Sequence, residues 1–179
     1  LHGIGRRQRQ MCIRDRMTGG PNAIGFEYFY GFTHARNIQT VIEQDTVVRE
    51  VKPVENQPLM IGRAVDFLKE QSSNKQKPFF LYFPMCPPHK PVVPAPEYVG
   101  KGGGGGKGSY GDWVYQGDSM LGQLLDTLES TGLANNTLVL VSADNGAAGR
   151  DYPPLRDNKG SIYEGCLLYT SPSPRDGTK

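Results

Sequence analysis

The feature that most constrains this chain is a pair of short apolar runs, each preceded by a segment with helical spacing. The runs are Pro78–Phe83 and Thr137–Val141, and their length suits a buried strand better than a helix. Apolar residues recur at helical spacing from Pro58 to Gln71, and Asp112 stands where a second helix could begin. Alternating helix and buried strand predicts an α/β fold with a largely parallel sheet flanked by helices.

Each predicted helix carries one apolar face. Pro58 is well placed for the first turn of the first helix, and Gly132 stands where the second should end. Thr46–Pro53 is rich in β-branched residues and predicts a strand or hairpin arm. Gly102–Gly106 is expected to be flexible. The two faces are Leu59, Ile61, Ala64, Val65 and Leu68, then Val114, Leu121, Leu124, Leu125 and Leu128.

The two ends of the chain are expected to be foreign to the protein. Back-translation of Arg6–Arg16 permits the nucleotide run AGATGTGTATAAGAGACAG, and that of Cys166–Asp176, with a C from the codon of Gly165, permits its reverse complement. An inverted repeat around an insert resembles the adapters that transposase-based sequencing libraries attach to DNA. We therefore expect residues 1–16 and 166–179 to be translated adapter and flank. The alternative is a basic tail and a Pro/Ser linker, and the source nucleotides decide between the two.

Removing these ends changes the charge and cysteine arguments. The ends carry seven basic and two acidic residues, so the net charge of +2 for the whole chain becomes −3 for residues 17–165. A nucleic-acid partner therefore loses its electrostatic basis. Only Cys86 remains of the three cysteines, so no internal disulfide is predicted. No apolar run is long enough to predict a membrane span.

Polar residues whose side chains could bind a ligand or take part in catalysis follow each apolar run. In parallel sheets, ligands gather beyond the carboxyl ends of strands. Asp144 and Asn145 offer a carboxylate and an amide oxygen directly after the second run, and calcium prefers oxygen ligands of this kind. The alternative for Asp144-Asn145-Gly146 is an ordinary turn.

Two further side chains suit anionic substrate chemistry. His89 lies in Pro84–Pro96, a segment with six prolines that is expected to be an extended loop. Stiff flanks suit an imidazole that donates a proton, although an exposed histidine is the simpler alternative. Lys159 is flanked by small residues and could bind an anion, or could be a solvated surface lysine. Cys86 is interpreted as a loop or core thiol.

The motifs follow one another in an order that resembles the middle of the sulfatase family, close to arylsulfatase-like members. Gly25–Gly31 extends the likeness upstream. The resemblance implies a partial alkaline-phosphatase-like fold, truncated at both ends, with residues 17–165 as part of a sulfatase catalytic domain. The ordered motifs are Lys77–Phe83, Pro88–Pro91, Gly111-Asp112, Asn136–Val139, Ala143–Gly146 and Lys159–Gly165.

The resemblance also implies roles for matched positions. Asp144 and Asn145 match the family's second pair of calcium ligands. His89 matches the histidine that protonates the departing oxygen, and Lys159 matches the lysine that binds sulfate oxygens. The family's nucleophile, a formylglycine made from cysteine in Cys-x-Pro-x-Arg, has no counterpart here. Cys86-Pro87-Pro88-His89-Lys90 ends in lysine instead of arginine.

The implied function is that of a fragment of a sulfuric ester hydrolase, with a sulfate ester substrate such as an aryl sulfate or a sulfated carbohydrate. The chain alone is expected to be inactive because the formylglycine nucleophile is missing. Two alternatives stay open: a related phosphodiesterase or phosphonate hydrolase, and a non-catalytic α/β binding module. The resemblance suggests a periplasmic, secreted or lysosomal location, and the oligomeric state stays open.

Overall fold

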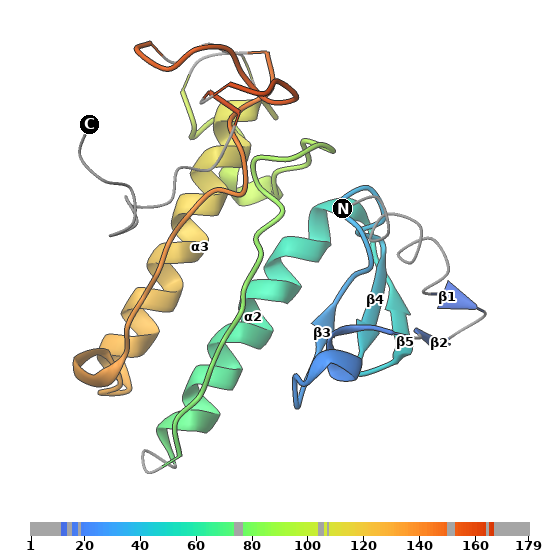
Figure 1. The fold of residues 1–179 in the computed structure, drawn as a ribbon. Helices are drawn as coiled ribbons and strands as arrows, with labels where there is room; N and C mark the ends of the chain where they lie inside the picture. Colours follow the sequence, from blue (N-terminus) through green and yellow to red (C-terminus); the bar gives the residue numbers. More distant parts are fainter. Residues whose placement is uncertain are drawn as a thin grey trace, which may run out of the picture. The chain divides into compact units, whose positions relative to one another are not determined.

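The computed structural model describes residues 12–13, 16–17, 19–73, 77–103, 106, 108–149, 153–163 and 165–166. It divides into two compact units, Leu1–Thr137 and Leu138–Lys179, and each is described by itself. All named helices and strands lie in the first unit (Figure 1). They are β1 (Cys12–Ile13), β2 (Arg16–Met17), η2 (Pro21–Ile24), β3 (Tyr30–Gly31), β4 (Thr40–Glu43), β5 (Thr46–Glu50), α2 (Pro53–Ser72), η3 (Pro96–Tyr98), α3 (Tyr110–Ser130) and η4 (Ala134–Asn136).

The strands form one small antiparallel sheet in the order β1-β2-β5-β4-β3. Its centre is the β4–β5 hairpin, in which Thr40 lies opposite Glu50 and Glu43 opposite Thr46, with a bulge between Val41 and Ile42. Val41 and Ile42 are both buried, whereas most of β5 is exposed. The strand or hairpin arm predicted at Thr46–Pro53 is therefore confirmed as β5 over Thr46–Glu50, whereas Pro53 belongs to α2.

The largely parallel sheet that we predicted is absent from the described residues. Pro78–Phe83 and Thr137–Val141 have no assigned strand and no ladder partner. Phe79 and Leu81 pack on a hydrophobic cluster, but Phe80 between them is 75% exposed. Leu138 and Leu140 in the second run are 83% and 84% exposed. A parallel sheet forms only where neighbouring strands pair and both faces are covered, and neither run meets those conditions within the described residues.

Helix α2 begins earlier than predicted. Its N-cap is Lys52, whose backbone N–H donates to Glu55 Oε2 at 2.9 Å, and Pro53 supplies a first-turn φ suited to a helix. Pro58, the predicted start, lies inside the helix, where it removes one backbone hydrogen bond. The predicted face is confirmed in its main part, since the buried apolar residues of α2 are Met60, Ile61, Ala64 and Leu68.

Helix α3 also begins before its predicted cap. Ser109 is the N-cap, and its Oγ accepts the Asp112 backbone N–H at 3.4 Å, while the Asp112 carboxylate accepts the Ser109 N–H at 3.3 Å. Asp112 therefore occupies the third helical position of a capping box instead of the cap itself. The predicted end is confirmed, because Gly132 has φ 69° and the Leu133 N–H donates to the Leu128 carbonyl at 2.9 Å.

The buried face of α3 is rotated from the predicted one. Trp113 and Met120 are fully buried, whereas Val114 and Leu125 are exposed. The buried stripe includes Gln116 and Gly117, and these two non-apolar residues conceal its periodicity in the sequence.

The Asp112 carboxylate organises the described part of the Gly-rich loop. It accepts backbone N–H groups from Gly100, Gly102 and Gly108, each at 2.8 Å, besides that of Ser109. These hydrogen bonds to the charged form hold the pKa of Asp112 below its usual range. The predicted flexibility of Gly102–Gly106 falls partly outside the described residues.

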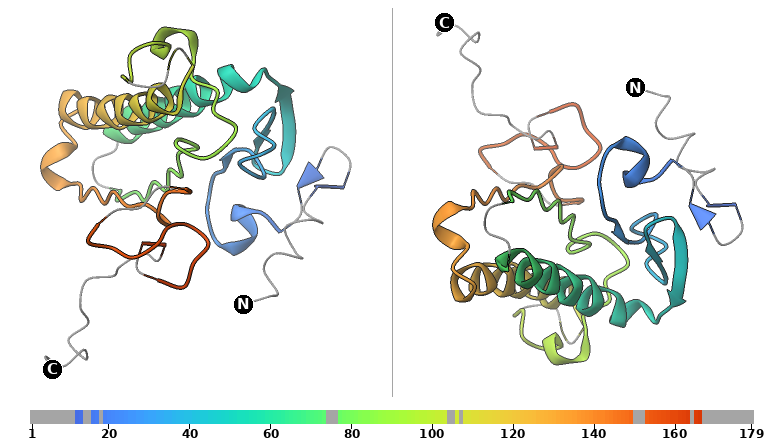
Figure 2. Two further views of the ribbon diagram at one scale, coloured as in Figure 1. Left: turned by 90° about the horizontal axis from the view of Figure 1, so that it is seen from above. Right: turned by 90° about the horizontal axis from the view of Figure 1, so that it is seen from below.

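Two hydrophobic clusters stabilise the first unit. Leu68 of α2 and Leu128 of α3 pack together with Leu133, so the carboxyl-terminal ends of the two helices lie side by side (Figures 1 and 2). The second cluster contains Ile38, Cys86 and Trp113. None of the helices in the described part of the chain is long and apolar enough to span a membrane.

Candidate functional site

His89 is half-buried in the Pro-rich loop, Pro84–Pro96. Its backbone N–H donates to the Cys86 carbonyl at 2.8 Å, and its carbonyl accepts the Trp113 indole N–H at 2.9 Å. Its ring Nδ1 lies 2.5 Å from the Lys90 carbonyl oxygen. A carbonyl can only accept, so this contact places the proton of the neutral ring on Nδ1. Nε2 has no hydrogen-bond partner among the described residues and is the nitrogen left to exchange a proton with a ligand.

Buried polar side chains of α2 and α3 hold the two ends of this loop. Gln57 Oε1 accepts the Cys86 N–H at 3.2 Å, and Gln116 Oε1 accepts the Ala95 N–H at 2.8 Å. Both glutamines are 1% exposed. An unpaired buried amide costs free energy, so these hydrogen bonds compensate for burying the two side chains.

A short hydrogen-bond chain continues from the loop toward the sheet. Gln57 Nε2 donates to Asn56 Oδ1 at 2.8 Å, and Asn56 Nδ2 donates to the Ile38 carbonyl at 2.6 Å. Every buried polar side-chain atom in the described part of the chain has a hydrogen-bond partner. The segment before β4, helix α2 and the Pro-rich loop thus share one satisfied buried network.

The thiol of Cys86 belongs to the core. It is 4% exposed and lies in the cluster with Ile38 and Trp113. Burial raises its pKa to about 11, so the thiolate is a minor species at neutral pH. This confirms the interpretation of Cys86 as a core thiol, in a position unsuited to a nucleophile.

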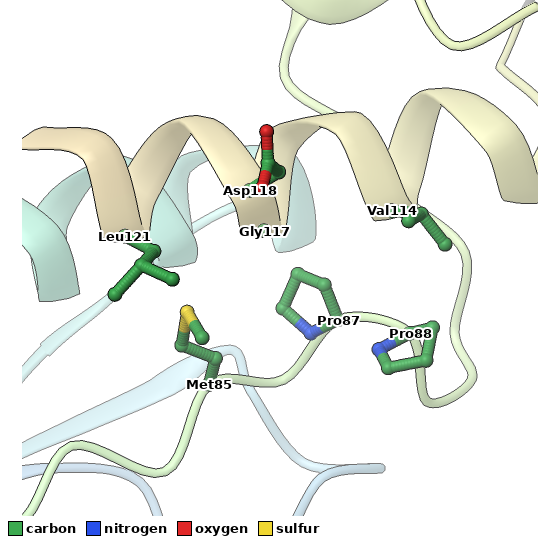
Figure 3. A pocket seen from close by; sticks show the side chains of 7 residues that line it. All are labelled: Met85, Pro87, Pro88, Val114, Gly117, Asp118 and Leu121. Atoms are coloured by element: carbon green, nitrogen blue, oxygen red, sulfur yellow. The ribbon is translucent and has the colours of Figure 1, made fainter. Parts of the chain in front are cut away.

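A shallow cavity of about 230 Å³ lies between the Pro-rich loop and α3. Figure 3 shows Met85, Pro87 and Pro88 of the loop facing this helix. A Cβ on Gly117 would stand 3.1 Å from the Pro87 Cβ. The missing side chain at Gly117 therefore lets the loop approach the helix closely.

Asp144 and Asn145 lie in the second unit, in a bend that follows the exposed second run. Asp144 is exposed and Asn145 is half-buried. Backbone contacts hold the bend, since the Gly146 N–H donates to the Cys166 carbonyl at 3.0 Å. A Cβ on Gly146 would overlap the Gly165 carbonyl oxygen, so the close approach of these two backbones requires glycine at position 146.

Lys159 is exposed in the same unit. Its backbone N–H donates to the Ala147 carbonyl at 3.1 Å. This hydrogen bond brings the Lys159 backbone beside the bend that carries Asp144 and Asn145, although the three are separated in sequence. These residues therefore share one unit, whereas His89 belongs to the other.

The calcium ion that the sequence resemblance implies needs more ligands than Asp144 and Asn145 provide. Asp144 and Asn145 supply carboxylate and amide oxygens, which suit a hard cation, but calcium takes about six to eight oxygen ligands. The described residues contain no group of three or more His, Cys, Asp or Glu side chains arranged to hold a metal. The pair fits calcium chemically as part of a larger ligand set.

Three side chains that hold the Pro-rich loop were not predicted from the sequence: Gln57, Trp113 and Gln116. Their signal is a polar or amphipathic residue inside the buried stripe of a helix. Gln116 lies three residues after Trp113 on α3, and Gln57 lies within the first two turns of α2. Nothing in their local spacing indicates which backbone they contact.

A model of the sulfatase family matches residues 6–176, and the chain therefore belongs to the sulfatase family. It is 33% identical over 117 residues to arylsulfatase H of Homo sapiens, covering 65% of this chain and 20% of that protein. It is 33% identical over 116 residues to N-acetylgalactosamine-6-sulfatase of Rattus norvegicus, covering 61% and 21%. With steryl-sulfatase of Rattus norvegicus it shares 32% over 149 residues, covering 80% and 25%.

The chain thus spans about a fifth to a quarter of the length of these curated relatives. Membership of the family implies an alkaline-phosphatase-like α/β fold. The described residues form two α-helices and a small antiparallel sheet.

Proposed function

We propose that this chain is part of an arylsulfatase-type sulfuric ester hydrolase that cleaves sulfate monoesters. The hydrogen bonds of His89 carry the catalytic assignment. Its backbone N–H, its carbonyl and its Nδ1 all have partners, whereas Nε2 has none among the described residues. A protonated imidazole held in this way has one N–H available for a substrate. We assign this N–H the task of protonating the ester oxygen as the alcohol or phenol departs.

We assign binding of the sulfate group and of calcium to three residues, Asp144, Asn145 and Lys159. Lys159 would neutralise charge on the sulfate oxygens, and Asp144 with Asn145 would supply two ligands to calcium. Calcium, when bound, polarises the sulfate group as a Lewis acid. The hydrogen bond between Lys159 N–H and the Ala147 carbonyl supports this grouping. The remaining calcium ligands and the formylglycine nucleophile belong to parts of the parent enzyme without counterparts in this chain.

Sulfate esters are favoured over the two alternatives. The match to the sulfatase family and to proteins named as sulfatases favours sulfate over phosphodiester or phosphonate substrates. A non-catalytic binding module gives no reason for His89, Lys159 and the Asp144-Asn145 pair to stand where the sulfatase resemblance implies functional residues. The names of the relatives support an aryl sulfate or a sulfated carbohydrate as substrate. We place the parent enzyme in the periplasm, outside the cell or in a lysosome-like compartment.

The role of His89 is tested in the complete enzyme that contains this sequence. His89→Asn should lower kcat by about 10²- to 10⁴-fold on an alkyl sulfate, whose leaving oxygen needs a proton. The loss on 4-nitrophenyl sulfate should be much smaller, because nitrophenoxide departs without protonation. Equal losses on both substrates would contradict a general-acid role. His34→Asn is the matched control, because His34 is exposed and lies outside the Pro-rich loop.

Three further measurements test the calcium ligands, the class of reaction and the inactivity of the chain alone. Asp144→Asn should raise the calcium concentration needed for half-maximal activity, whereas Asp126→Asn on the exposed surface of α3 should not. The enzyme should hydrolyse 4-nitrophenyl sulfate in preference to 4-nitrophenyl phosphate. Preference for the phosphate would favour the phosphatase-type alternative. The 179-residue chain alone should hydrolyse neither ester, because it lacks the Cys-x-Pro-x-Arg nucleophile motif.

A further inference from the structure

The carbonyl of His89 is held by a residue from outside its own loop. The N–H of His89 and its Nδ1 are satisfied within the loop, by Cys86 and Lys90. The His89 carbonyl instead accepts from the indole of Trp113, which lies 24 positions later on α3. This hydrogen bond fixes the peptide unit through which the chain passes from His89 to Lys90. Lys90 in turn provides the carbonyl that faces Nδ1.

The indole is itself held rigidly. Trp113 is 0% exposed and packs against Ile38 and Cys86. An indole has one donor and no acceptor, so the direction of its N–H follows from the packing of the ring. That N–H points at the His89 carbonyl from a helix, and a helix is a more rigid support than a loop.

Neighbouring residues keep the loop against this helix. Gln57 and Gln116 bind the backbone at Cys86 and Ala95. The absence of a side chain at Gly117 admits Pro87 to the helix surface, as Figure 3 shows. The loop is thus bound at both ends and in the middle. The hydrogen bond from Trp113 is the contact that touches His89.

We infer that Trp113 is a positioning residue for His89: its indole N–H holds the His89 carbonyl so that Lys90 keeps the Nδ1–H tautomer and Nε2 stays available. The inference rests on the proposed role of His89 as a proton donor. Trp113 touches no substrate in this account and acts through the histidine. The competing explanation is that Trp113 only fills the core. The two explanations differ in what happens when an aromatic ring is kept in the core at position 113 and the N–H is removed.

Trp113→Phe makes that change in the 179-residue chain, and nitrogen NMR of the imidazole rings reports the tautomer. Loss of signals in His89→Asn assigns His89 among the three histidines. In the neutral His89 ring of the wild-type chain, Nδ1 should give the signal of a protonated nitrogen and Nε2 that of a bare one. In Trp113→Phe the two signals should converge, as in a ring that exchanges between tautomers. Unchanged signals in a folded variant would overturn the inference.

Controls separate positioning from stability. Tyr115→Phe removes a hydroxyl from an exposed aromatic residue of α3 and should leave the His89 signals unchanged. If Trp113→Phe does not fold, the wild-type chain decides the question, because its single tryptophan gives one indole N–H signal. A through-hydrogen-bond coupling from the indole nitrogen to the His89 carbonyl carbon, together with the Nδ1–H tautomer at His89, upholds the inference. An indole signal without that coupling overturns it.

The complete enzyme distinguishes failure of this inference from failure of the proposed function. Trp113→Phe should lower kcat on an alkyl sulfate by about tenfold, with KM nearly unchanged and a smaller loss on 4-nitrophenyl sulfate. If His89→Asn leaves turnover intact while the tautomer still depends on Trp113, the proposed function fails and the positioning contact stands. If His89→Asn abolishes turnover and Trp113→Phe changes neither tautomer nor kcat, the positioning inference alone fails.

Discussion

The Pro-rich loop and the segment Leu138–Cys166 both carry proposed site residues, but the chain holds them in different ways. Buried side chains of two helices bind the loop at Cys86, His89 and Ala95. In the described part of the later segment, the contacts are backbone hydrogen bonds and short side-chain contacts. Among the described residues, no hydrophobic side chain is buried beyond Leu133.

The two regions therefore differ in how firmly the backbone around their site residues is held in place. A backbone held by satisfied buried groups can open only if core contacts break, whereas a segment without buried apolar contacts opens at lower free energy. The position of His89 within its loop is therefore a property of the folded helices. The geometry of Asp144, Asn145 and Lys159 depends on the local backbone of the second unit.

The largest expected effect compares a core leucine with an exposed one. Leu68→Ala removes a side chain that is 2% exposed and packed between the two helices, and it should lower the free energy of unfolding by about 2–5 kcal/mol. Leu140→Ala, at a position that is 84% exposed, should change it by less than about 0.5 kcal/mol. Urea unfolding followed by circular dichroism measures both. A large loss for Leu140→Ala would show that the second run has a packing partner, and the comparison would fail.

The second expected effect concerns the reactivity of Cys86. Because burial raises its pKa to about 11 against about 8.5 for a free cysteine, alkylation at pH 8 should be at least about 100-fold slower than in an unstructured peptide. Mass spectrometry of the labelled chain resolves Cys86 from half-buried Cys166 in the second unit. Urea should abolish the protection of Cys86. Equal alkylation rates for Cys86 and Cys166 in the folded chain would show that the loop with Cys86 is no better protected than the second unit.

The sequence indicates the position of His89 but not what holds it. Prolines around His89 identify a stiff loop from local spacing alone. The contacts with Gln57 and Trp113 join residues 29 and 24 positions apart, so they depend on how the helices pack. Periodicity finds the face of α2 because its buried stripe is largely apolar. It misplaces the face of α3 because Gln116 and Gly117 interrupt that stripe.

The strand predictions show a different limit. A run such as Pro78–Phe83 has the composition of a buried strand, but a strand also needs partners, and the sequence of the run does not contain them. The strand at β5 was predictable because its partner β4 lies only a few residues earlier in the chain. The matched motifs indicated the family for a different reason, since their order does not depend on which strands pair.

Asp112 holds the Gly-rich loop in a third way, because its carboxylate accepts four backbone N–H groups. Its pKa is lowered in the folded chain by those hydrogen bonds, so the stabilisation is present above the ordinary aspartate pKa of about 3.9 and is lost as the pH falls toward the lower folded pKa. Asp112→Asn should therefore be less stable than wild type at pH 7, with the difference shrinking below about pH 4. Urea unfolding at a series of pH values measures it.

The control for Asp112 is Asp126→Asn, which changes an exposed aspartate on the same helix. Its difference from wild type should stay small across the pH range. A constant gap between wild type and Asp112→Asn from pH 7 to pH 3 would show that the carboxylate charge does not hold the loop.

The smallest expected effect tests how closely the Pro-rich loop rests on α3. Gly122→Ala places a methyl group where nothing lies within 4 Å and should stabilise the chain by about 0.5–1 kcal/mol, because alanine is the better helix former. Gly117→Ala gains the same helix propensity, but its Cβ would meet Pro87 at 3.1 Å, so the gain should be cancelled or reversed. Thermal unfolding of the two variants gives the difference. Equal stabilisation by both would mean that the loop moves away easily at Pro87. Gln57, Trp113 and Gln116 alone would then hold the loop that carries His89.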